Sequence, residues 1–379
     1  MLCQSCGRQV EERAYCPYCG AHIVGNTASA RGRGKRSHVF ALNPAEHLYH
    51  LSFVSTFFPH LSRQRTHQVR WLLFLSVLVV LVVSAGRFVP LSILLAALLM
   101  PVFYLLYFFD SQLYGNEPFR ILGATFALGA VLGGALGIGL YRYLLSHYQA
   151  GIVPATGYLL LTALALPLLF QALMLAGPLI LYFTRPRFDE LLDGLAFGAA
   201  SGLGFAATQS IVAAWLLIVG PFQQPGLLSS WLVPTLRIAL LTPLVNAATT
   251  GLICAAIWLR RDHAPQPKKL GVLLTWPVAL CLGMLGQVAP PLLSALIPGP
   301  ILQLLWYALI LSGLTLILRH VLHSGLIEKA RALGHGQRLV CPECHHEVAD
   351  MPFCPYCGLA LLSISRRMRR LLVRAEELV

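Results

Sequence analysis

Charged residues are scarce in this chain. Of its 379 residues, 11% are charged and 15 are acidic, whereas 57% are hydrophobic and the mean hydropathy is +0.69. Soluble domains carry about 25% charged residues, so this composition excludes a wholly soluble protein and predicts an integral membrane protein. The interiors of the long apolar runs also lack acids and histidines. Peptide hydrolysis inside a bilayer needs a carboxylate base or a metal-bound water to activate the attacking water, and these interiors supply neither.

Apolar runs long enough to cross roughly 30 Å of hydrocarbon occur about eight times. They cover residues 71–86, 89–109, 119–141, 157–183, 191–219, 231–259, 270–296 and 301–318. The first run is short, and several others are long enough to tilt or to extend past the bilayer, so the boundaries are approximate. We therefore predict an all-α polytopic membrane protein with about eight transmembrane helices.

The positive charges indicate the orientation of these helices. With both ends of the chain inside the cell, 25 of the 28 Lys and Arg residues fall in cytoplasmic segments, and the exceptions are Arg87, Arg142 and Arg237. Short cytoplasmic loops hold an excess of positive charge. The distribution predicts a multi-pass cell-membrane protein with both termini in the cytoplasm, and it explains the net charge of +13 without a nucleic acid partner.

Eight of the ten cysteines form two copies of one motif. Each copy holds two Cys-x-x-Cys pairs separated by nine residues: Cys3, Cys6, Cys16 and Cys19 near the start, and Cys341, Cys344, Cys354 and Cys357 near the end. Two such turns can place four thiolates around one ion, as in structural zinc sites. Disulfides and a redox dithiol are the alternatives, but a reducing cytosol disfavours the first and the second needs a single pair. We predict two small zinc ribbons that hold two structural zinc ions.

Basic segments connect the predicted ribbons to the membrane domain. The predicted divisions are an N-terminal zinc ribbon (1–24), a basic linker and interfacial helix (25–70), an eight-helix membrane domain (71–318), a linker (319–340), a C-terminal zinc ribbon (341–360) and a basic amphipathic tail (361–379). We expect the basic segments to bind anionic lipid headgroups. Histidines within 44–70 leave a metal site there open as an alternative. The ribbons themselves have few basic residues, so a protein partner is favoured over a nucleic acid.

The fifth apolar run carries a specific resemblance. From Asp193 to Ser210 it reads Asp-Gly-Leu-Ala-Phe-Gly-Ala-Ala-Ser-Gly-Leu-Gly-Phe-Ala-Ala-Thr-Gln-Ser. This resembles the phrase Asp-Gly-x-x-Tyr-Gly-x-x-x-Gly-x-Gly-Phe-x-x-x-Glu-Asn of the PrsW family of intramembrane proteases. Asp110 and Glu117-Pro118 upstream, and Arg237 and Asn246 downstream, extend the resemblance over roughly residues 90 to 290.

The sequence departs from the family at its ionisable positions. The resemblance implies a glutamate where this chain has Gln209, a membrane histidine at Asn246, and a Glu-Glu-x-x-Lys motif at Phe170, Gln171 and Met174. A later His and Asn of the family would fall near Gly283 and Gln287. Gln and Asn form hydrogen bonds but do not exchange protons near pH 7, so the resemblance implies that these catalytic positions are degenerate.

Three functions are compatible with these observations. The first is a catalytically inactive PrsW-like pseudoprotease that acts as a membrane scaffold or regulator and binds partner proteins through the ribbons or a membrane groove. The second is an active intramembrane protease whose base comes from a loop. Asp189, Glu190 and Asp193 are the nearest acids, and Asp193 at the mouth of the fifth run is the favoured one. The third is a transporter of a neutral substrate, since the amides in the apolar runs could line a polar cavity.

Overall fold

A computed structural model of the full chain describes most of the two ribbons and of the helical domain between them. The described residues are 1–23, 63–110, 119–148, 155–219, 235–260, 275–332 and 338–361, apart from short gaps at 5–6, 19, 87, 186–187, 189–190, 297–298, 342–343, 350, 352 and 360. Most of the predicted linker 25–70 and most of the tail 361–379 lie outside the described residues.

The described part of the membrane domain consists of helices joined by short turns. Its elements are α2 (Arg63–Ala85), α3 (Val89–Asp110), α4 (Phe119–Tyr148), α5 (Ala155–Leu160), η3 (Leu161–Ala165), α6 (Leu166–Thr184), α7 (Leu191–Val219), η4 (Arg237–Leu241), α9 (Thr242–Trp258), α10 (Trp276–Leu296) and α11 (Pro300–Ala332). The two elements η3 and η4 are single π-helical turns. A short antiparallel pair, β1 (Arg338–Val340) and β2 (Glu347–Ala349), belongs to the C-terminal ribbon, with Leu339 opposite Val348. The predicted all-α polytopic membrane class, with a four-cysteine group near the C-terminus, is confirmed.

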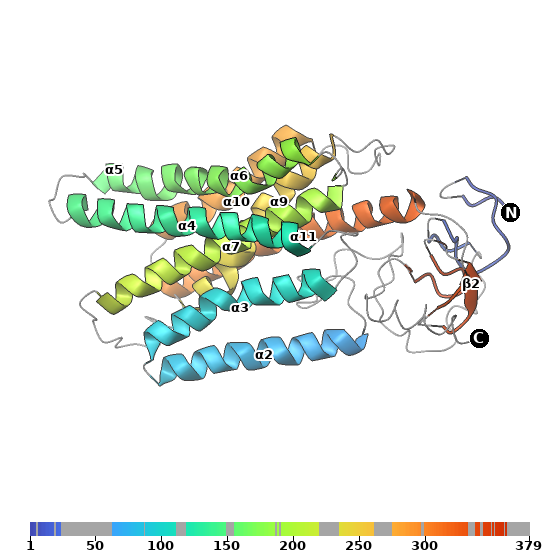
Figure 1. The fold of residues 1–379 in the computed structure, drawn as a ribbon, viewed down its shortest axis with the longest axis horizontal. Helices are drawn as coiled ribbons and strands as arrows, with labels where there is room; N and C mark the ends of the chain where they lie inside the picture. The colour runs from blue at the N-terminus through green and yellow to red at the C-terminus, as the bar shows by residue number, and fades with distance from the viewer. Residues whose placement is uncertain are drawn as a thin grey trace.

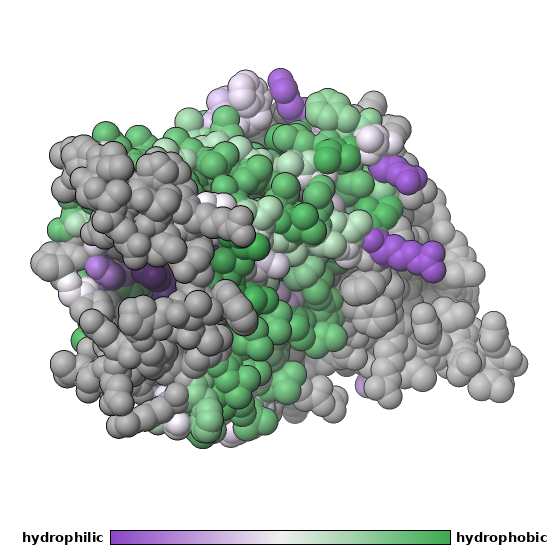
Figure 2. Space-filling model, turned by 60° about the vertical axis from the view of Figure 1, so that its left-hand side comes forward, coloured by the Kyte–Doolittle hydropathy of each residue, from purple (hydrophilic) through white to green (hydrophobic). Residues whose placement is uncertain are grey.

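Within the described part of the chain, six segments are long and apolar enough to cross a bilayer: Arg120–Leu140, Leu161–Thr184, Leu191–Val212, Arg237–Trp258, Trp276–Leu296 and Ile301–Val321. The apolar parts of α2 and α3, Arg70–Ala85 and Leu91–Tyr107, are shorter. These findings support a multi-pass membrane protein, and the count of eight spans stays a prediction. On the face shown in Figure 2, hydrophobic side chains form a broad surface over the helices, as contact with lipid requires.

Helix α7 lies at the centre of the bundle, where it packs chiefly against α4 and α9 (Figure 1). Within the membrane segments, 72% of α7 and 83% of the segment formed by η4 and α9 are buried, against 17% of α11. Glycine makes this packing possible. A Cβ atom at Gly198 would lie 2.6 Å from the Thr250 carbonyl oxygen of α9, and one at Gly204 would lie 2.1 Å from the Phe126 carbonyl oxygen of α4. The small residues of α7 therefore bring three backbones into close contact.

The structure differs from the expected arrangement near the C-terminal ribbon. Helix α11 continues to Ala332, well into the segment 319–340 predicted as a linker, and strand β1 begins at Arg338. The predicted boundary comes from hydropathy, which indicates where a helix leaves the membrane and not where the helix ends. Residues 319–332 contain no proline and no glycine besides Gly325, so the helix continues.

Candidate functional site

Two parallel local features position the predicted membrane site. In each of two helices a π-helical turn is followed by a proline at the start of the next α-helical segment: η3 precedes Pro167, and η4 precedes Pro243. Proline lacks an N–H donor and its ring crowds the carbonyl four residues earlier, so a widened turn accommodates it. Gln171 and Asn246 follow these prolines within about one turn and face the interior of the bundle.

The first half of the site joins α6, α7 and α9. The amide Nε2 of Gln171 donates to the hydroxyl of Thr250 at 3.2 Å, and that hydroxyl lies 3.6 Å from the Met174 sulfur. The Ser201 hydroxyl of α7 donates to the Met174 carbonyl at 2.7 Å. All four side chains are buried. The oxygen Oε1 of Gln171 is also buried, and it has no hydrogen-bond partner in the described structure.

The second half of the site joins α9 and α10. Nε2 of Gln287 donates to Oδ1 of Asn246 and to the hydroxyl of Thr249, each at 3.0 Å. Gln287 and Asn246 are nearly fully buried. Gly283, one turn earlier on α10, lets the helices approach, because a Cβ atom there would lie 2.5 Å from the Ile253 side chain. Polar side chains thus bridge α9 to both α6 and α10.

The other two predicted positions lie at the edges of this network. Phe170 is half-buried and packs against Phe205 of α7, with ring centroids 5.5 Å apart. Gln209 is half-buried on α7, seven residues after Gly202, whose backbone touches Asn246. Seven residues of helix span about 10 Å, so Gln209 lies further along the bundle and no described contact joins it to Asn246. The structure therefore joins Gln171 and Met174 through Thr250, with Phe170 next to Gln171 on α6. Asn246 lies one turn before Thr250 on α9 and contacts Gln287, and Gln209 lies apart.

Sequence reasoning missed two members of the network. Thr249 and Ser201 both contribute hydrogen bonds, but a hydroxyl in a membrane helix commonly bonds to its own backbone, and Thr249 also does so to Val245 at 2.9 Å. Helical spacing could have predicted Thr249 as a member of the network. Thr249 lies three residues after Asn246, so the two side chains share a helix face.

The network contains amides, hydroxyls and a thioether, and all are neutral near pH 7. A catalytic metal in a membrane protease needs His, carboxylate or thiolate ligands. These residues do not fit such a metal. Among the described residues, the group of His, Cys, Asp or Glu side chains close enough to share an ion lies in the C-terminal ribbon instead.

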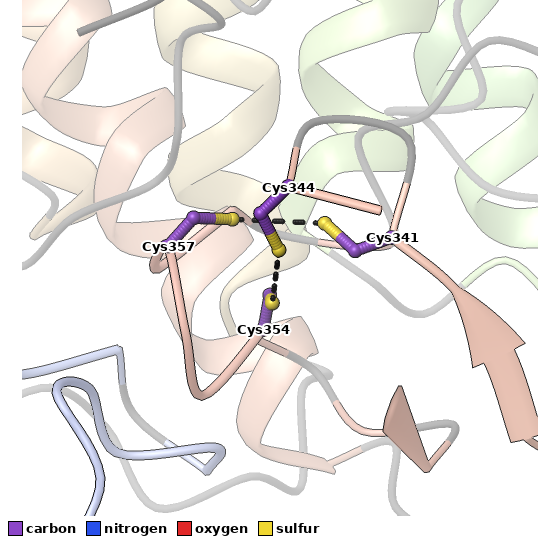
Figure 3. A group of neighbouring side chains, drawn as sticks. All are labelled: Cys341, Cys344, Cys354 and Cys357. Carbon is purple, nitrogen blue, oxygen red and sulfur yellow. Dashed lines mark hydrogen bonds between the residues drawn. The ribbon is translucent and has the colours of Figure 1, made fainter. Parts of the chain in front are cut away.

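That group is the predicted set Cys341, Cys344, Cys354 and Cys357 (Figure 3). All four sulfurs lie within 4.8 Å of one another, and the Sγ atoms of Cys341 and Cys357, and of Cys344 and Cys354, are 3.6 Å apart. Zn–S bonds of about 2.3 Å in a tetrahedron place sulfurs about 3.8 Å apart. The four thiols therefore form a group that could bind a metal ion.

The ionisation of these thiols indicates what the group needs. Hydrogen bonds from Cys341 and Cys357 lower the pKa of Cys354 to about 5. Hydrogen bonds with Cys341 and Cys354, together with burial, raise the pKa of Cys357 above its usual range. The Cys354 thiolate therefore forms readily, whereas a second thiolate at Cys357 is disfavoured. Four thiolates in this space require a cation to balance them.

Backbone geometry shows that both ribbons use the same turns. In each Cys-x-x-Cys pair the fourth residue after the first cysteine donates its N–H to that cysteine's carbonyl: Gly7 to Cys3, Gly20 to Cys16, His345 to Cys341 and Gly358 to Cys354, at 2.8–2.9 Å. All four donors have a positive φ, including His345 at 57°. Cys3 and Cys16 are buried, as a ligand set requires, while Cys6 and Cys19 lie outside the described residues.

Comparisons with known proteins agree with the membrane site. The model of the family described as "PrsW family intramembrane metalloprotease" matches residues 117–326, more than half of the chain. Among curated proteins, the chain is similar to Protease PrsW of Bacillus subtilis (strain 168), with 29% identity over 121 residues. That match covers 32% of this chain and 53% of the relative, so the chain spans about half the length of the relative it matches. No solved structure matches. The α6, α7, α9 and α10 network lies within the matched range, and the chain belongs to the PrsW family of intramembrane metalloproteases.

Proposed function

We propose that this protein is a catalytically inactive PrsW-family member that serves as a membrane scaffold or regulator. The observation that carries the proposal is a neutral network where the sequence resemblance implies ionisable residues: Gln171, Met174 and Asn246 are buried among hydroxyls and amides. Hydrolysis needs a group that takes a proton from water or a metal that lowers its pKa. Amides and hydroxyls do neither at physiological pH.

The same network supports a binding role. Interhelical hydrogen bonds in membranes contribute only about 0.6 kcal/mol each on average. The described bonds of the network join α9 to α6 and α10, whereas α9 packs against α7 through glycine contacts. The Gln171 oxygen remains a buried acceptor without a described partner. A donor from a partner helix or a bound polar molecule would satisfy it. We therefore propose that the membrane domain binds a protein segment near Gln171 without cleaving it.

An active protease is the second candidate, because Asp193 is a buried carboxylate in the first turn of α7. A carboxylate alone can act as a general base, but an efficient site also requires a group that stabilises the developing charge. This candidate is the alternative that the cleavage test addresses.

We also propose that each ribbon holds one structural zinc ion and that both ribbons lie in the cytoplasm. The four-thiol geometry and the shared turns of the two ribbons support the zinc sites. A reducing compartment and the distribution of positive charge support the location. The bilayer, anionic headgroups and a protein partner are the expected binding partners.

The catalytic proposal is tested with a membrane-spanning peptide substrate in reconstituted vesicles, with Protease PrsW of Bacillus subtilis as a positive control. We expect no cleavage by this protein, and no change for Asp193→Asn. Cleavage that disappears in Asp193→Asn would overturn the proposal and favour the second candidate.

A composite variant provides the matched gain-of-function control. Phe170→Glu, Gln171→Glu, Gln209→Glu and Asn246→His together replace the neutral groups with ionisable ones. Because residues that act as a unit are strongly non-additive, Gln209→Glu alone should not produce activity. We expect cleavage, if any, from the composite variant alone. Its folding is checked first, because the new buried charges can destabilise the bundle.

A further inference from the structure

The two ribbons contact each other through equivalent residues. The N–H of Tyr15 donates to the carbonyl of Pro355 at 3.0 Å, and the N–H of Phe353 donates to the carbonyl of Pro17 at 3.0 Å. Tyr15 and Phe353 each precede the third cysteine of their ribbon, and Pro17 and Pro355 each follow it. The contact is therefore reciprocal, as in an interface with two-fold symmetry, although both halves belong to one chain.

The side chains at the interface also form two equivalent contacts. A Cβ atom at Gly20 would lie 2.9 Å from the Phe353 ring, and one at Gly358 would lie 2.9 Å from the Tyr15 ring. Each aromatic ring thus packs on the glycine of the other ribbon's second turn. Both glycines also have a positive φ, which the metal-site turn requires. The residues that shape each metal site are the residues that form the interface.

Two further contacts tie the pair together and to the bundle. Arg13 of the first ribbon lies over the ring of Tyr356, with its guanidinium carbon 4.7 Å from the centroid, and hydrogen-bonds to the Tyr356 hydroxyl. Phe353 is fully buried and belongs to the same continuous cluster of apolar side chains as Phe188 and Trp258 of the membrane domain. In Figure 1 the first ribbon and β2 lie beside each other at one end of the bundle.

From these contacts we infer that the two ribbons form a single two-metal clasp, which joins the two ends of the chain and in which each ribbon's hold on its metal depends on the other ribbon. The inference rests on the zinc sites of the proposed function. A segment of about twenty residues buries too little apolar surface to fold alone, so the metal orders each ribbon. Since Tyr15 and Phe353 adjoin ligand cysteines, loss of either metal removes half of the interface.

The clasp has a direct test in the full-length protein. A specific protease site is placed within residues 25–37, and the purified protein is cut there under reducing conditions. With zinc bound, the N-terminal fragment should remain with the rest of the chain through size-exclusion chromatography. After treatment with a zinc chelator it should separate. Separation from the zinc-loaded wild type, or retention after the zinc has been removed, would contradict the clasp.

Matched variants separate the interface from the fold of each ribbon. Tyr15→Ala removes a ring that packs on the other ribbon, and the fragment should dissociate even with zinc bound. Tyr18→Ala removes a ring that holds Arg8 within its own ribbon, at 4.9 Å, and the fragment should be retained. Retention of both fragments would show that the interface does not need the Tyr15 ring, and loss of both would show that removing either ring disrupts the first ribbon. Either result would overturn the inference.

Zinc release tests the dependence between the two sites. Cys344→Ser removes a ligand of the second ribbon, and the ion of the first ribbon should then be released to a chromogenic chelator about tenfold faster than from the wild type, which corresponds to about 1.4 kcal/mol. An unchanged release rate would overturn the clasp and leave two independent zinc sites. A wild type with fewer than two zinc ions per chain would overturn the zinc proposal itself, and the clasp with it.

Discussion

At the scale of single residues, His345 is the one donor among the four metal-site turns that is not glycine. Its φ is 57°, in the left-handed region, while Gly7, Gly20 and Gly358 have φ of 70–76°. A side chain in this region costs roughly 1–2 kcal/mol. Its neighbour His346 stacks on Tyr356 with ring centroids 4.2 Å apart, which holds the turn in place.

We expect His345→Gly to slow zinc release from the C-terminal ribbon, because the turn would no longer carry this strain. Gly7→Ala is the matched opposite change. Gly7 has the same left-handed conformation and no atom within 4 Å of an added Cβ, so the substitution tests backbone strain alone, and it should speed release from the first ribbon. Stopped-flow measurement with a chromogenic chelator gives both rates. A faster release from His345→Gly would show that the imidazole itself supports the site.

The two buried glutamines of the membrane site should respond differently to replacement by leucine. Gln287→Leu removes two hydrogen bonds and leaves Oδ1 of Asn246 without its donor, so we expect a loss of about 1 kcal/mol of stability. Gln171→Leu removes one longer hydrogen bond together with a buried oxygen that has no described partner, and we expect no loss. Denaturation in mixed micelles compares the two. An equal loss for Gln171→Leu would indicate that its oxygen is engaged by a bound molecule.

At the scale of elements, the glycines of α7 determine how the bundle packs. Gly194, Gly198 and Gly202 face α9, and Gly204 faces α4. An Ala in place of Gly normally favours a helix by about 1 kcal/mol, so a destabilising Gly→Ala change identifies a backbone contact.

We therefore expect Gly204→Ala to lower the thermal midpoint of the detergent-solubilised protein, since its Cβ would lie 2.1 Å from the Phe126 carbonyl oxygen and the backbone of α4 would have to move. Gly139→Ala on α4 is the control, because nothing lies within 4 Å of an added Cβ there, and it should leave the midpoint unchanged or raise it. Equal midpoints for the two variants would show that Gly204 is not required for the close approach of α7 to α4.

Several elements could be predicted from the sequence because hydropathy and length determine them. The helix predicted at 191–219 has these bounds, and the one predicted at 89–109 ends one residue later. The four-cysteine group at the C-terminus also follows from its spacing. Other features depend on contacts between distant residues. Nothing in the local pattern around Gln209 shows that it lies apart from Asn246, and nothing around Tyr15 shows that its ring packs on Gly358.

At the scale of the whole molecule, the paired ribbons constrain how the chain crosses the membrane. Two segments that exchange backbone hydrogen bonds, at Tyr15 with Pro355 and at Phe353 with Pro17, must lie on the same side. The chain then crosses an even number of times. The same condition agrees with the predicted eight spans and with six, so it does not decide whether α2 and α3 both cross.

Reporter fusions test the side on which the ribbons lie. A reporter that is active only outside the cytoplasm, fused after Val379, should give no signal, because the positive charges place the ribbons inside. The same reporter inserted after Ala150, between α4 and α5, should give a strong signal, since this loop is expected on the opposite side and confirms that the reporter is exported and folds. Signals with the reverse pattern would place both ribbons outside the cytoplasm, where thiols are readily oxidised, and would count against zinc in either of them.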